Sequence, residues 1–217
     1  AGASEAAVRA AGAIQATIGV LDGRIRIGLD ENELERFTPE ARKLGPRDLA
    51  VCAVQRAVGA TTVGGTLVAA AAVGIRFMGT GGLGGVHRGF PDPPDVSADL
   101  GACARIPAVI VSAGVKSLLD VPATVEVLET LGVPVLGYRT DTLPLFYDAA
   151  GGPPVSARAD DATEIARIAE AHWRAEPARN PARRTRQALP RVASQRTRTR
   201  GAPSQRSPRR ARALQRS

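Results

Sequence analysis

The sequence predicts an α/β protein with three layers, in which helices cover both faces of a central mixed, largely parallel sheet. From residue 75 onward, short apolar runs alternate with helical segments, which is the pattern of strands joined by crossover helices. A hairpin pattern near the start adds antiparallel pairing at one edge of that sheet. Residues 1–176 also have the length of one α/β unit.

The first elements are a helix and a hairpin. Helical periodicity covers residues 5–11, and alternating apolar residues from Ile14 predict a strand over residues 14–20. The chain turns at Asp22-Gly23, a pair typical of a type I′ turn, and returns through Ile25 and Ile27. Asp30 can then cap a short helix that extends to Phe37.

The remaining elements follow in alternation. Helices are predicted over residues 47–58, 64–73, 98–104, 122–131 and 161–174, and strands over residues 75–78, 108–111 and 133–137.

The charge of the chain divides it into two segments. Of its 29 basic residues, 13 are arginines in residues 177–217, a segment without any acidic residue, so residues 1–176 carry a formal charge of −5. We expect a domain over 1–176 and a disordered arginine-rich tail over 177–217. The tail could bind nucleic acid through counterion release. It lacks lysine and aromatic residues, which favours the alternative that it is a gene segment translated out of frame after Glu176.

Cysteine usage and hydropathy exclude several classes. Cys52 and Cys103 have no CxxC spacing, so neither a zinc site nor a disulfide framework is predicted. No apolar run approaches 18 residues and no signal peptide is recognisable, so we expect a soluble cytoplasmic protein without a membrane partner. Because the sequence opens inside a helical pattern, we expect its natural N-terminus to lie upstream of Ala1.

Lys116 is the first candidate for chemistry. It is one of two lysines, with Lys43, beside 27 arginines, and only lysine can lose its proton and attack a carbonyl carbon. It follows the apolar run 108–111, and strand ends are where open α/β sheets present reactive groups. The alternative is a solvated lysine at a helix start. The apolar setting favours chemistry and predicts a desolvated amine.

A glycine-rich loop follows the first strand of the alternating region. Gly79, Gly81 and Gly84 satisfy GxGxxG, but the prolines that follow Phe90 prevent the helix that a dinucleotide site requires. The loop amides could still hold one phosphate, with charge from His87 and Arg88. A glycine turn without a ligand is the alternative.

An acidic cluster comes next in the chain. If Asp95 caps a helix, Ser97 and Asp99 fall in its first turn, where free amides attract an anion. One carboxylate with water molecules suits hydrated Mn²⁺ or Mg²⁺. Asp95 could instead be a plain helix cap.

Together these residues resemble the pseudouridine-5′-phosphate glycosidase, or pseudouridylate synthase, family over about residues 5–174. The resemblance lies in five segments that keep the family's order: Thr61-Thr62-Val63; GTGGLGGVHRG from Gly79; Asp95-Val96-Ser97-Ala98-Asp99; Ser112-Ala113-Gly114-Val115-Lys116-Ser117 with Asp120-Val121-Pro122; and Gly137-Tyr138-Arg139-Thr140-Asp141 with Phe146-Tyr147. It implies reversible cleavage of the C–C glycosidic bond of pseudouridine 5′-phosphate to uracil and ribose 5-phosphate, by a homotrimer that uses a divalent metal.

The resemblance also implies roles for single residues. Lys116 would be the nucleophile that forms a covalent adduct with the ribose, and Asp95 the manganese ligand. The substrate-binding residues would be Lys43, Val63, Thr80, His87, Ser97, Ala98 and Asp99.

Two departures from the family pattern bear on activity. The family's acid/base glutamate lies in a segment before the hairpin that this sequence does not contain, and its later half is replaced by the arginine-rich tail. We therefore expect a domain that is incomplete at both ends and a rate reduced by roughly 10² to 10⁴. An inactive phosphosugar-binding remnant and nucleic-acid binding through the tail remain as alternatives.

Overall fold

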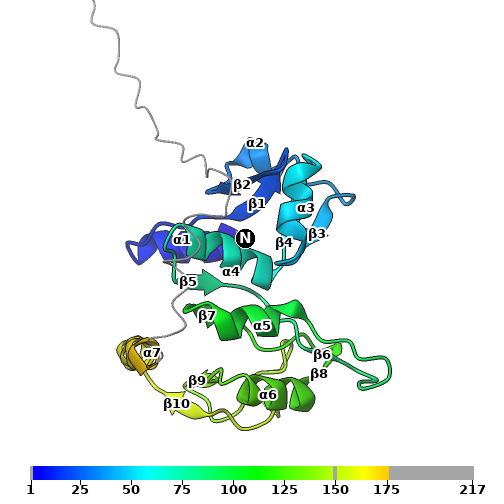
Figure 1. Ribbon diagram of the computed structural model, residues 1–217. Coiled ribbons are helices and arrows are strands. Elements are labelled where there is room, and N and C mark those ends of the chain that lie inside the picture. Colours follow the sequence, from blue (N-terminus) through cyan, green and yellow to red (C-terminus); the bar gives the residue numbers. More distant parts are fainter. Residues whose placement is uncertain (1, 149–150, 176–217) are drawn as a thin grey trace, which may run out of the picture.

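The structure is a computed structural model that describes residues 2–148 and 151–175 (Figure 1). The mixture of helices and strands in these residues confirms the α/β class. The hydrogen bonds join the described strands into four small sheets, whereas the sequence predicted one central sheet. Strands of two to four residues present too few backbone groups for a single wide sheet. The predicted tail, residues 177–217, lies outside the described residues.

The largest sheet has four strands in the order β2-β1-β4-β3. Its strands are β1 (Ile18–Leu21), β2 (Arg24–Ile27), β3 (Arg42–Leu44) and β4 (Gly59–Thr61). β1 pairs antiparallel with β2 and β4, and β3 pairs parallel with β4.

The hairpin lies at the edge of this sheet, as the sequence predicted. Asp22 and Gly23 both have positive φ angles, 51° and 72°, which is the geometry of the predicted type I′ turn. The first strand begins at Ile18 and not at the predicted Ile14. Ile14 is 95% exposed and has no partner in the pairing of β1 with β2, so nothing holds it in a strand.

The helices agree with most of the predicted segments. They are α1 (Gly2–Ala10), α2 (Glu31–Leu34), α3 (Asp48–Val54), α4 (Val63–Ala72), α5 (Ala98–Arg105), α6 (Val121–Thr130) and α7 (Ala162–Ala175). Asp30 caps α2 with a full capping box, and α2 ends at Leu34. α3 stops four residues before its predicted end, because Arg56 adopts a positive φ of 49° that a helix cannot continue. No described helix is both long enough and apolar enough to span a bilayer.

Two parallel strands, β5 (Phe77–Gly79) and β7 (Val109–Val111), run beside α4 and α5 in the middle of the molecule (Figure 1). Met78 and Ile110 point to one side, where they pack against Val63 and Leu67 of α4. The opposite side carries Phe77 and Val111, each 67% exposed. One face of this strand pair is therefore core, and the other is an apolar surface.

The remaining strands form two further pairs. β6 (Val86–His87) pairs antiparallel with β8 (Leu119–Asp120), and β9 (Leu136–Tyr138) pairs parallel with β10 (Ala157–Ala159). Asp120 caps α6 through the Ala123 N–H.

Candidate functional site

The site is built where β5 and β7 end. Because the two strands are parallel and Gly79 pairs with Val111, the loops that follow them leave the sheet side by side. The Thr80 N–H donates to the Val111 carbonyl (2.9 Å), and the Ala113 N–H donates to the Gly81 carbonyl (2.8 Å). The Leu83 N–H then bonds the Gly114 carbonyl (2.9 Å), and the Lys116 N–H bonds the Leu83 carbonyl (3.2 Å). The backbone ladder thus holds the glycine loop against the Lys116 loop.

The Lys116 side chain lies over this glycine loop and is exposed. A Cβ atom placed on Gly82 would lie 2.9 Å from Lys116 Cγ, and 2.7 and 2.8 Å from two ring carbons of Phe146. Gly82 therefore makes room for both side chains. The exposure contradicts the predicted desolvation, because β7 ends before the lysine and the loop brings its side chain to the surface.

Asp99 is the buried polar centre of the region, with only 5% exposure. Its Oδ1 accepts the Gly64 N–H at 2.7 Å, so a carboxylate in the first turn of α5 satisfies an amide in the first turn of α4. Its Oδ2 lies against Gly84 of the glycine loop. Two helix N-termini and the glycine loop therefore meet at one carboxylate, an arrangement favoured by both helix dipoles.

Ser97 is the N-cap of α5, so the cap is not Asp95. The Ser97 hydroxyl accepts the Asp99 N–H (3.2 Å), and the Ser97 N–H donates to the Gly85 carbonyl (2.9 Å). Ala98, the first residue of α5, is exposed. The helix starts three residues after Asp95 because the intervening segment is held in an extended bridge, Val96 to Val86.

His87 and Asp95 face each other across this bridge. Their backbones are joined by the His87 N–H and the Asp95 carbonyl (2.9 Å), and His87 Nδ1 lies 3.6 Å from Asp95 Oδ2. Both side chains are partly open to solvent, with 45% and 63% exposure. Thr80 lies at the other end of the loop, directly after β5.

Lys43 lies on β3 of the four-stranded sheet and Val63 begins α4, and no contact of the Lys43 side chain with the glycine loop is seen among the described residues. Lys43 pairs with Ala60 across β3 and β4, and its side chain is exposed. The next residue on β3, Leu44, accepts the Thr62 N–H (2.9 Å), which ties the end of β3 to the start of α4. Val63 is 8% exposed in the core, so a substrate contact at Val63 would involve its backbone N–H.

The metal prediction fits the residues present only as a hydrated ion. No cluster of three or more His, Cys, Asp or Glu side chains suited to a metal occurs in residues 2–148 and 151–175. Asp95 is exposed and offers one carboxylate, while Asp99 Oδ1 is already engaged by Gly64. A single open carboxylate suits Mg²⁺ or Mn²⁺ that keeps most of its water.

Two further residues shape the site, Phe146 and Thr124, and the sequence analysis assigned neither of them a role in it. Phe146 lies beside Gly82 although it is more than sixty positions away in sequence. Thr124 is fully buried, accepts the Val86 N–H (2.9 Å) and donates to the Asp120 carbonyl (2.6 Å), which supports the glycine loop from α6. The extra glycines of the loop were the available signal, since a Cβ at Gly82 would contact Phe146 and one at Gly85 would overlap Thr124.

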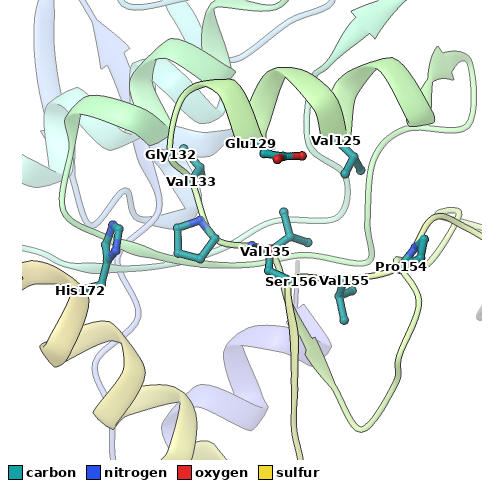
Figure 2. A pocket seen from close by; sticks show the side chains of 10 residues that line it. Val125, Glu129, Gly132, Val133, Val135, Pro154, Val155, Ser156 and His172 are labelled. Carbon is teal, nitrogen blue, oxygen red and sulfur yellow. Dashed lines mark hydrogen bonds between the residues drawn. The ribbon is translucent and has the colours of Figure 1, made fainter.

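A groove of about 550 Å³ lies elsewhere, between α6, α7 and the segments around Val135 and Val155 (Figure 2). Glu129 and His172 reach it from the two helices, and the rest of its lining is mainly valine and proline. None of the predicted site residues lines it.

Comparison with known proteins identifies relatives of this chain. Residues 1–182 match the family described as Indigoidine synthase A like protein. The pseudouridine-5′-phosphate glycosidase of Jannaschia sp. is 51% identical over 167 residues, covering 76% of this chain and 55% of the relative. The corresponding enzyme of Myxococcus xanthus is 48% identical over 174 residues, covering 79% and 57%. The chain thus spans little more than half the length of these relatives.

Solved structures agree with the sequence relatives. The prealnumycin C-glycosynthase AlnA, crystallised with ribulose 5-phosphate, superimposes with a TM-score of 0.75 at 46% identity, covering 78% of this chain and 57% of that one. An indigoidine synthase A-like protein from Thermotoga maritima gives a TM-score of 0.73 at 39% identity, covering 79% and 58%. The chain therefore belongs to the indigoidine synthase A-like, or pseudouridine-5′-phosphate glycosidase, family.

Proposed function

We propose that this chain carries the part of a pseudouridine-5′-phosphate glycosidase active site that binds the phosphosugar, here called the half-site. In this half-site Lys116 forms a covalent adduct with ribose 5-phosphate. The observation that carries the proposal is the ladder that holds an exposed lysine directly over the glycine loop. The relatives support it, because the names of the glycosidases and the ligand of AlnA share a pentose 5-phosphate.

The chemistry assigned to Lys116 follows from the bond to be broken. A C–C glycosidic bond has no good leaving group, so the sugar carbon needs a covalent amine partner before the bond can break. In the cleavage direction the Lys116 amine bonds to C1 of the ribose as the C1–O4 bond breaks, and the ring oxygen takes a proton. The nitrogen lone pair then forms an imine with C1 while the electrons of the C–C bond leave with C5 of uracil, which takes a proton, and water hydrolyses the imine to release ribose 5-phosphate. In the reverse direction the amine condenses with the aldehyde of open-chain ribose 5-phosphate with loss of water, and the imine carbon accepts C5 of uracil.

The phosphate has two sources of attraction. The glycine loop and the first residues of α4 and α5, Val63 and Ala98, would supply backbone N–H groups at helix N-termini, where anions bind well. In this proposal the Lys43 and His87 side chains add further contacts to the phosphate, and Ser97 and Thr80 add hydroxyl groups. Asp99, with Oδ1 committed to Gly64, would contact the sugar only through Oδ2.

Asp95 would hold a hydrated Mn²⁺ or Mg²⁺ near the sugar, and such an ion would supply electrostatic stabilisation to substrate oxygens. A single carboxylate implies weak binding and free exchange. Titration with Mn²⁺ should show saturable binding that Asp95→Asn abolishes. Equal affinity in both proteins would leave Asp95 without a metal role.

Trapping of the adduct is the decisive test. Ribose 5-phosphate and borohydride are added at a pH of about 9, where a few per cent of an ordinary exposed lysine is neutral. The hydride converts the imine to a stable secondary amine, and peptide mass spectrometry locates it. We expect the label on Lys116, with Lys116→Arg as the unlabelled control. A label on Lys43 alone, or none at saturating sugar in the folded protein, would refute the assignment.

We also propose the homotrimer that the family resemblance implies. Light scattering coupled to gel filtration should give three times the chain mass of 22.5 kDa. A monomer that still forms the Lys116 adduct would show that this half-site does not need the assembly.

A further inference from the structure

Phe146 stands out because its backbone conformation is unusual for a large side chain. Its φ angle is +64°, and the Tyr147 N–H donates to the Leu145 carbonyl at 2.7 Å. This is a γ-turn of the strained form, which bulky residues rarely adopt. Such a conformation persists only where the surrounding structure enforces it.

The surrounding structure is the Lys116 loop itself. Leu145 forms a β-bridge with Gly114, two residues before Lys116, and the Leu145 N–H is held by the Asp148 carbonyl (2.8 Å). Gly114 has a φ of +105°, and any side chain there would overlap the Pro144 carbonyl. The two loops are therefore in backbone contact immediately before Phe146.

The turn directs the Phe146 ring toward Gly82 and the Lys116 side chain. Two of its ring carbons and Lys116 Cγ lie within 3 Å of the position that a Cβ on Gly82 would occupy. The ring and the glycine backbone thus border the aliphatic stem of Lys116. The ring is half-buried, and its other neighbour is Tyr147, whose ring meets it edge-on at 4.6 Å and is 84% exposed.

We propose that Phe146 is a positioning residue, whose ring restricts the Lys116 stem so that the amine is held over the glycine loop. The role rests on the proposed function, because it matters only if Lys116 reacts with the sugar. It gives a role to a strained aromatic residue beside a lysine whose side-chain amine has no hydrogen-bond or ion-pair partner among the described residues. Aromatic rings commonly border the hydrocarbon stems of lysines in this way.

The test exploits the fact that the chain has only two lysines. Phe146→Gly removes the ring and also relieves the positive φ, so this variant is expected to fold. Phe146→Leu keeps apolar bulk, and Tyr147→Ala removes the neighbouring exposed ring as a matched control. The first readout is the ratio of Lys116 to Lys43 acetylation by limiting acetic anhydride. The second is the rate of borohydride trapping as a function of ribose 5-phosphate concentration.

In Phe146→Gly the acetylation ratio should rise about 1.4- to 2.3-fold, the change produced by losing one modest side-chain contact. The maximal trapping rate should fall roughly 10- to 100-fold, with an unchanged half-saturating sugar concentration, because binding survives while alignment is lost. Phe146→Leu should have an acetylation ratio near that of the wild type. Its maximal trapping rate should lie between those of the wild type and Phe146→Gly. Tyr147→Ala should match the wild type in both.

An unchanged acetylation ratio in Phe146→Gly would overturn the proposal, as would an equal effect of Tyr147→Ala. A uniform loss of both readouts would show a merely structural role and would also overturn it. If the wild-type protein traps no sugar on Lys116, the proposed function fails, and the acetylation ratio still decides whether Phe146 restrains the lysine.

Discussion

Replacement of Asp99 by alanine should be the most destabilising single change near the site. It removes a charge-assisted hydrogen bond and leaves the buried Gly64 N–H without an acceptor, at a cost of roughly 1.5 to 3 kcal/mol. The carboxylate also interacts with the N-termini of α4 and α5, which adds about 0.3 to 1 kcal/mol for each helix. Relief of the cost of burying a carboxylate offsets part of this sum. We expect a net loss of about 2 to 3 kcal/mol in the free energy of unfolding.

Urea unfolding followed by circular dichroism measures this loss, provided the slope with urea is the same in each variant. Ser97→Ala is the matched control, because it removes only the α5 cap and should cost about 1 kcal/mol. Asp99→Asn keeps an oxygen acceptor for the Gly64 N–H, so its loss of unfolding free energy should lie between those of Ser97→Ala and Asp99→Ala. The reasoning is refuted if Asp99→Ala destabilises the protein less than Ser97→Ala does.

Three further predictions concern Thr124, Cys103 and Lys43. Thr124→Val should lose roughly 1 to 3 kcal/mol of unfolding free energy in urea titrations, because the Val86 N–H is left buried without an acceptor, whereas Thr124→Ser should lose less than half as much. Burial, reinforced by the nearby Asp99 carboxylate, raises the pKa of the Cys103 thiol from 9.0 to about 12. The folded state therefore favours the protonated thiol, and stability should fall as the pH rises from about 9 toward about 12, a loss that Cys103→Ala should lack when unfolding is measured at both ends of that range. Lys43→Ala should weaken ribose 5-phosphate binding by about 1 to 3 kcal/mol in calorimetry, and an unchanged affinity in the folded variant would remove Lys43 from the site.

The sequence predicted the helices and the hairpin well because their local signals are strong. Asp22-Gly23 requires positive φ at two positions, and Asp30 with Glu33 forms a capping box, so both features were readable without tertiary information. The short strands were harder to predict. β6 and β8 have two residues each, and β3 is the sequence Arg-Lys-Leu, so neither length nor periodicity distinguished them from loops.

The site was predictable to the extent that it depends on strand ends. Parallel β5 and β7 bring the loop that begins at Thr80 against the loop that carries Lys116, as the positions of both loops after apolar runs implied. The position of Phe146 depends on a γ-turn and a bridge to Gly114, which are tertiary contacts without a local signature. The exposure of Lys116 was predicted wrongly, because an apolar strand says nothing about the loop that follows it.

The open face of β5 and β7 is expected to affect how this protein behaves in concentrated solution. In residues 2–148 and 151–175 these strands pair only with each other, and Phe77 and Val111 present apolar surface beside unpaired backbone groups. Parallel strands are normally covered on both faces, and an uncovered edge of this kind is a template for pairing with other molecules. The protein should therefore associate through this face while it is still folded, and a charged residue at position 77 should raise the concentration at which it precipitates.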